Sequence, residues 1–132
     1  MSGSVLADTS AWVEFLRSTG SPADRALETA MRDRTLLVTG PVLMELLAGA
    51  TDAEEWRDLQ RLTFAFDFTH VQSPADWIDA GALRRRMRSV GTAVPSQVDC
   101  LIAVIAMRVG AALLHKDADF DAIADVAPLR LA

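Results

Sequence analysis

Short apolar runs alternate with longer amphipathic segments along the whole chain. In the longer segments apolar side chains recur at helical spacing, whereas the short runs have the length of strands. Strands are expected at 4–8, 35–40, 66–71 and 111–114, with a last one near 128–132. Helices are expected at 9–17, 22–32, 41–50, 52–62, 73–91, 95–110 and 117–125. This alternation predicts an α/β fold with a mainly parallel sheet of four or five short strands between helices.

Proline, serine and glycine mark the ends of several expected helices. Pro41 stands at a first helical position, where the N–H that proline lacks has no partner to lose. Ser73 is expected to cap the helix at 73–91, with Pro74 just inside it and Gly91 as its stop. The segment 95–110 is apolar nearly all round, which predicts a buried helix. We find no linker or internal repeat, so residues 1–132 are expected to form a single domain.

Acidic residues gather where this fold would place a ligand site, outside the carboxyl ends of the strands. They come from four separate segments: Asp8, Glu45, Asp99, and Asp117 with Asp119. Asp8 closes the first strand, and Asp117 follows the strand at 111–114. Glu45 and Asp99 lie on apolar helices with no basic residue within one turn. Ionised acids are rarely buried without a partner, so a hard cation shared by several oxygens is the expected partner.

Each acid also has an ordinary structural interpretation. Asp8 and Asp117 both directly precede expected helices and are plausible N-caps. Asp121, on the outer face of the last helix, is expected to be solvated. Capping alone does not account for Glu45 and Asp99, which is why the cation interpretation is preferred.

Composition narrows the function classes and the metal. The chain has 132 residues and a net charge of −5, which argues against a protein that coats duplex nucleic acid but leaves open an enzyme acting on it. Cys100 is the only cysteine, and His70 and His115 are too few for a zinc site. Oxygen ligands alone predict Mg²⁺ or Mn²⁺. No signal peptide or membrane-spanning run is visible, so a cytoplasmic protein is expected.

Four motifs in this order and spacing, "LADTSAWVEFL", "GPVLMELLAG", "VDCLIAVIA" and "LLHKDADFDAI", resemble the PIN-domain ribonucleases. Within that family they look most like the toxins of bacterial VapBC toxin–antitoxin pairs. The resemblance covers essentially the whole chain. It implies a three-layer α/β/α sandwich of the PIN type.

The resemblance also implies an activity and a set of residues. A VapC-type toxin is an Mg²⁺- or Mn²⁺-dependent endoribonuclease that inhibits translation or growth, works as a dimer and is inhibited by a VapB-type antitoxin. Carried over by position, the catalytic acids are Asp8, Glu45, Asp99 and Asp117, and the metal ligands are Asp8, Asp99, Asp117 and Asp119. Thr9 or Ser10 would support Asp8. His115 replaces a Thr or Ser found in many relatives, and it is expected to line the site in a supporting structural or substrate-contact role and not as a metal ligand.

Phosphodiester hydrolysis explains why acids would be crowded together. The reaction needs an activated water and an electrophilic clamp on the developing negative charge, which one or two metal ions can supply. Carboxylates hold the metal and leave positions open for water and phosphate. Any one of them could also orient or deprotonate the water.

A basic cluster lies in "LRRRMR" at 83–88. Arg84, Arg85 and Arg88 share a face at helical spacing and are expected to contact RNA phosphates, the alternative being a solvated helix face. The apolar surplus, with tryptophans at positions 12, 56 and 77, exceeds what a small domain must bury, and some of it is expected to lie in a dimer or antitoxin interface.

Three other classes of protein share part of this pattern. A haloacid dehalogenase would need a second acid two residues after Asp8, where this chain has Ser10. A receiver-like signalling domain would need paired acids at the first strand, and Lys116 is a poor match to that family. A degenerate PIN-like domain that only binds a partner is disfavoured because all four acids are retained.

Overall fold

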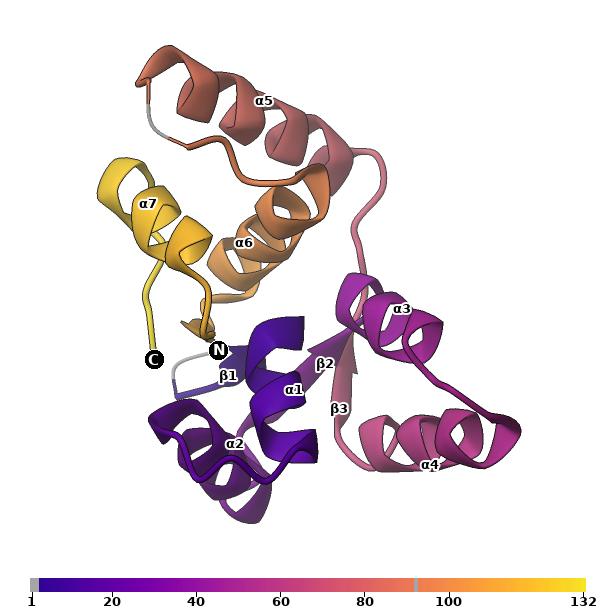
Figure 1. Cartoon of the computed structure of the whole chain (residues 1–132). Helices are drawn as coiled ribbons and strands as arrows, with labels where there is room; N and C mark the ends of the chain where they lie inside the picture. Colours follow the sequence, from indigo (N-terminus) through magenta and orange to yellow (C-terminus); the bar gives the residue numbers. More distant parts are fainter. Residues whose placement is uncertain (1–2, 92) are drawn as a thin grey trace.

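A parallel four-stranded sheet runs through the centre of the molecule (Figure 1). The structure is a computed structural model that describes residues 3–91 and 93–132. The strands are β1 (Val5–Ala7), β2 (Leu36–Thr39), β3 (Asp67–Thr69) and β4 (Ala112–Leu114). They lie in the order β3-β2-β1-β4, and every neighbouring pair is parallel. Because all carboxyl ends of the strands meet at one edge, residues that follow β1 and β4 become neighbours.

In the part of the chain that the structure describes, seven helices connect and cover these strands. They are α1 (Thr9–Leu16), α2 (Pro22–Arg32), α3 (Gly40–Ala48), α4 (Ala53–Thr63), α5 (Ala75–Ser89), α6 (Gln97–Val109) and α7 (Ala118–Val126). Figure 1 shows α1 and α2 on one side of the strands and α5, α6 and α7 grouped on the other. The chain moves one way along the sheet from β1 through β2 to β3, and then returns past β1 to β4. Because parallel crossovers are right-handed, the two directions place their helices on opposite faces of the sheet. The expected three-layer α/β/α arrangement is therefore confirmed.

The core explains why α6 is apolar nearly all round. The seven residues from Cys100 to Ala106 are all buried between the sheet and the neighbouring helices. Gly110 then adopts φ 70, a left-handed conformation that ends the helix and turns the chain into β4. Asp99, one residue before the buried run, is thereby fixed at the carboxyl edge of the sheet.

Two expectations were wrong, the strand near 128–132 and the cap of the helix at 73–91. Residues 128–132 do not form a strand, and only Leu131 makes an isolated bridge, to Leu113. Pro128 has no N–H to donate, and the N–H of Leu129 donates to Ala127 O at 2.8 Å, so pairing with β4 starts only at Arg130.

The second concerns the start of α5. Ser73 does not cap this helix, which begins at Ala75 with Pro74 at the N-cap position. The turn is closed by Gln72 and Asp76, because Gln72 N–H donates to Asp76 Oδ2 at 2.7 Å and Asp76 N–H donates to Gln72 O at 2.8 Å. These two bonds replace the expected serine cap.

The three tryptophans divide between core and surface. Trp12 is fully buried and packs edge-on to Phe15, so it belongs to the part of the apolar surplus that the core takes up. Its position on the face of α1 that meets the sheet accounts for this. Trp56 and Trp77 are 45% and 55% exposed. None of the helices in the described ranges has the length and apolar character to cross a membrane.

Candidate active site

Asp8 is the most deeply buried acid at the carboxyl edge of the sheet, with 3% of its surface exposed. It follows β1 and caps α1, its Oδ2 accepting from Ser10 N–H at 3.0 Å and from Ser10 Oγ at 2.7 Å. Its other oxygen, Oδ1, is buried and has no hydrogen-bond partner. A buried carboxylate oxygen without a donor is costly, so this atom is suited to a bound cation. The capping and cation interpretations of Asp8 are therefore compatible, one for each oxygen.

Ser10 joins the end of β1 to the loop after β4. Its Oγ accepts a hydrogen bond from Lys116 N–H at 2.9 Å while donating to Asp8. Asp8 N–H in turn donates to Leu114 O at 2.9 Å. These bonds fix the orientation of the Asp8 carboxylate and bring the loop that carries Asp117 alongside it. Of the two residues expected to support Asp8, Ser10 has that role.

Three further acids form a tight cluster. Asp99, Asp117 and Asp119 each offer a carboxylate oxygen, and these oxygens all lie within 4.8 Å of one another. Asp117 caps α7, accepting from Asp119 N–H at 2.9 Å, and Asp99 lies in the first turn of α6. All three are partly buried. Acids brought so close without a cation repel one another.

Burial and this crowding both raise the pKa of Asp99. It is raised from an ordinary value of 3.8 to about 6, first by burial and then by the negative charges of Asp8 and Asp117, with a smaller effect of Asp119. Between about pH 4 and pH 6 the native protein therefore holds more protons than the unfolded chain. The stability contributed by Asp99 falls as the pH rises through this window and stays lost at pH 7. The charge of Asp8 acting on Asp99 also places Asp8 beside the cluster.

Glu45 lies outside both the cluster and the group of acids that act on the pKa of Asp99. It is exposed on α3, and its Oε1 accepts a hydrogen bond from Thr9 Oγ1 at 2.6 Å. Thr9 therefore holds Glu45 rather than Asp8. Since Thr9 directly follows Asp8, Glu45 lies at the rim of the same site, on the side formed by α1 and α3.

His115 stabilises the turn that carries the acids. Its Nδ1 accepts from Asp117 N–H at 3.0 Å, and its ring lies against Phe120 with centroids 5.4 Å apart. Its Nε2 faces Asp121 Oδ1 at 3.4 Å. With both ring nitrogens engaged, His115 positions the Asp117 backbone. Asp121 is more than a solvated acid, because it contacts this histidine.

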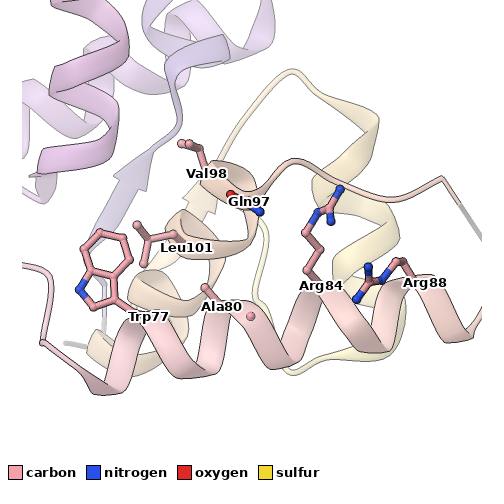
Figure 2. A pocket seen from close by; sticks show the side chains of 8 residues that line it. Trp77, Ala80, Arg84, Arg88, Gln97, Val98 and Leu101 are labelled. Atoms are coloured by element: carbon pink, nitrogen blue, oxygen red, sulfur yellow. The ribbon is translucent and has the colours of Figure 1, made fainter.

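The arginines of α5 lie on the other side of α6 from the sheet. Arg84 and Arg88 line a cavity of about 480 Å³ between α5 and the start of α6, whereas Arg85 is exposed outside it (Figure 2). Trp77 and Gln97 line the same cavity. The sequence pattern did not assign either residue to a site with the arginines. The available signal was spacing, because Trp77 precedes Arg84 by two helical turns and Gln97 precedes Asp99 by two residues.

The donor set fits a hard divalent cation. Only carboxylate oxygens converge here, and within residues 3–91 and 93–132 no cysteine or histidine joins them. Asp8 Oδ1 is buried and unsatisfied beside a cluster whose charges repel. Oxygen ligands of this kind are those that hard divalent cations prefer.

A model of the PIN domain family matches residues 5–126, from the first residue of β1 to the last residue of α7. The chain belongs to the PIN domain family.

Relatives of this PIN domain cover its full length. It is 38% identical over 130 residues to "Ribonuclease VapC11" of Mycobacterium tuberculosis and to "VapC ribonuclease Mb1587" of Mycobacterium bovis, covering 97% of this chain and 97% of each relative. The resemblance inferred from the four motifs is thereby confirmed.

Solved structures share the fold of this PIN domain at low sequence identity. VapBC2 from Rickettsia felis, crystallised with a promoter DNA fragment, aligns with a TM-score of 0.75 and 18% identity, over 97% of this chain and 96% of that one. Mycobacterium tuberculosis VapC20, described as a toxin that cleaves the sarcin-ricin loop, aligns with a TM-score of 0.64 and 19% identity, over 96% and 99% of the two chains. At these identities the likeness supports the fold alone.

Proposed function

We propose that this chain is a metal-dependent endoribonuclease that acts as the toxin of a VapBC-type toxin–antitoxin pair. One observation carries the proposal: a buried, unpartnered oxygen of Asp8 lies beside a cluster of three further acids at the carboxyl edge of a parallel sheet. The family and the full-length relatives named as ribonucleases support the assignment of RNA as substrate.

The residues divide into those that hold the cation and those that hold its ligands. Asp8 Oδ1, Asp99, Asp117 and Asp119 would bind Mg²⁺ or Mn²⁺, which when bound polarises the phosphate and activates a water. Ser10 fixes the free oxygen of Asp8 by occupying the other one. His115 holds the backbone N–H of Asp117, and the cap of α7 occupies one oxygen of its carboxylate.

Glu45 has a separate role in this proposal. It is exposed and held by a short hydrogen bond from Thr9, at the rim of the cluster. A carboxylate in that position is accessible to solvent, so it can accept a proton from water or orient a water toward the phosphate. We assign Glu45 this orienting role and exclude it from the set of metal ligands.

The proposal includes partners. Several of the solved structures that share this fold are complexes of toxin with antitoxin, among them one from Klebsiella pneumoniae with a TM-score of 0.70 and 19% identity, over 97% of this chain and all of that one. We propose a VapB-type antitoxin for this chain, RNA as substrate and a homodimer as the active form. Exposed apolar side chains, among them Met44, Trp56 and Phe64, supply surface for such contacts.

Incubation of the purified protein with RNA tests the activity. A mixture of labelled single-stranded RNA, transfer RNA and ribosomal RNA should be cut in Mg²⁺ or Mn²⁺, because the acids can then bind the cation that hydrolysis requires. Excess EDTA should stop cleavage, and added Mn²⁺ should restore it. Asp125→Asn, an exposed acid of α7 outside the cluster, is the matched control and should cut as the wild type does. Full activity in EDTA would contradict the proposal.

A further inference from the structure

The cavity between α5 and the start of α6 has the side chains of a nucleotide-binding site. We propose that it binds a nucleotide of the substrate RNA next to the cleaved phosphate, with the base on Trp77 and the phosphate on Arg84 and Arg88. This inference rests on the proposed ribonuclease function and adds to it a determinant of substrate choice.

The first observation is the unpaired positive charge. Arg84 donates from Nε to Pro95 O at 3.1 Å, and Arg88 is exposed. In the described part of the chain, neither guanidinium has a carboxylate within 4.0 Å, whereas Arg108 pairs with Asp76. In a protein with a net charge of −5, two adjacent unpaired arginines select an anionic ligand. A guanidinium is suited to phosphate, which it can contact through two N–H groups at once.

The second observation is an exposed aromatic ring at the opposite end of the cavity. Trp77 is 55% exposed, and among the described aromatic side chains none is paired with its ring. Figure 2 shows Trp77 beside Leu101 at one end of the cavity and the two arginines toward the other. Trp77 and Arg84 are two helical turns apart, about 10 Å along α5. A free indole face separated in this way from cationic groups matches the base and the backbone of single-stranded RNA.

The third observation is the position of the cavity relative to the acids. Gln97 and Val98 line it, and both precede Asp99 within the first turn of α6. An RNA strand whose phosphate lies at the acidic cluster therefore has a neighbouring nucleotide within reach of the cavity. Gln97 is exposed and offers both a donor and an acceptor to the edge of a base. The volume of about 480 Å³ is within the range of small-molecule sites.

Equilibrium binding of a fluorescent single-stranded RNA 12-mer, measured in EDTA so that it is not cut, tests this proposal. Trp77→Ala should weaken binding about tenfold and Trp77→Phe much less, because phenylalanine retains a face for stacking. Arg84→Gln with Arg88→Gln should weaken binding and reduce the slope of log K against log salt by about 1.4. Ile78→Ala and Arg86→Gln, an exposed apolar residue and an exposed arginine of α5 outside the cavity, are the matched controls and should bind as the wild type does.

Cleavage in Mn²⁺ separates this inference from the proposed function. Mapping of cut sites in random RNA should show that Trp77→Ala changes which bases flank the cut while the reaction stays sensitive to EDTA. If the wild type cuts RNA but the cavity variants bind and cut like their controls, the inference is wrong and the function stands. If the wild type neither binds nor cuts RNA, the proposed function is wrong, and the inference that rests on it is wrong too. If Trp77→Ala weakens binding only by dissociating a dimer, seen by sedimentation, the cavity is a self-association surface and the inference is also wrong.

Discussion

Asp99→Asn is expected to reduce metal-dependent RNA hydrolysis by roughly two to three orders of magnitude while the protein stays folded. Asp99 lies at the centre of the cluster, with oxygens of Asp117 and Asp119 within 4.8 Å and the charge of Asp8 raising its pKa. An amide keeps the size of the side chain but removes the negative charge that holds the cation. The measurement is the initial rate of cleavage of a labelled RNA in Mn²⁺.

Two further variants, Asp8→Asn and Glu45→Gln, are compared with Asp99→Asn. Asp8→Asn should lose a similar factor, because it disables the buried Oδ1 that has no protein partner. Glu45→Gln should lose less and leave Mn²⁺ affinity unchanged, since Glu45 lies outside the cluster and is held by Thr9. Retention of most of the wild-type rate by Asp99→Asn would show that these acids do not form the catalytic site.

The largest loss of stability is expected from Asp76→Ala, at about 3–5 kcal/mol. Asp76 is fully buried at the start of α5, and its carboxylate accepts three bonds from Arg108 of α6, at 2.9, 3.2 and 3.0 Å. It also accepts from Gln72 N–H at 2.7 Å. Removing it leaves the Arg108 charge without its carboxylate partner and leaves Gln72 N–H without its acceptor. Urea unfolding at pH 7 measures the loss.

The exposed pair of Asp58 and Arg61, 3.4 Å apart on α4, is the matched control. Asp58→Ala should cost less than about 1 kcal/mol, because both side chains are mostly exposed to water. Asp76→Ala together with Arg108→Met should recover part of the loss, since no unpaired charge then remains. An equal, small effect of Asp76→Ala and Asp58→Ala would mean that the buried pair does not hold α5 to α6.

The order of strands and helices could be predicted from the sequence because each element carries its own local signal. Apolar runs marked the strands, and Ser96 and Asp117 cap helices close to where the pattern placed them. The segment at 128–132 has the same apolar character but no independent partner. Whether it pairs with β4 depends on its backbone N–H groups. Pro128 has none, and that of Leu129 already donates to Ala127 O.

The candidate site was predictable in part for a related reason. Asp8 and Asp117 follow strands, and parallel strands necessarily bring such residues to one edge. The hydrogen bond from Thr9 to Glu45 spans 36 positions, and the pairing of Asp76 with Arg108 spans 32. No local pattern encodes such pairs. Trp12 and Trp77 likewise both lie on helices, and only the packing of those helices distinguishes them. The packing of α1 against the sheet buries Trp12, whereas Trp77 on α5 stays exposed.

The central claim is that these acids form a divalent-cation site, and the shift of the thermal unfolding midpoint caused by Mn²⁺ at pH 7 tests it most directly. In EDTA, Asp99→Asn should unfold at a higher temperature than the wild type, because the raised pKa of Asp99 shows that its charge destabilises the metal-free protein. Mn²⁺ at a hundred times its dissociation constant should stabilise the wild type by about 2.7 kcal/mol and Asp99→Asn far less. A wild-type midpoint that Mn²⁺ leaves unmoved, together with a destabilised Asp99→Asn in EDTA, would contradict the account and leave the acids as helix caps.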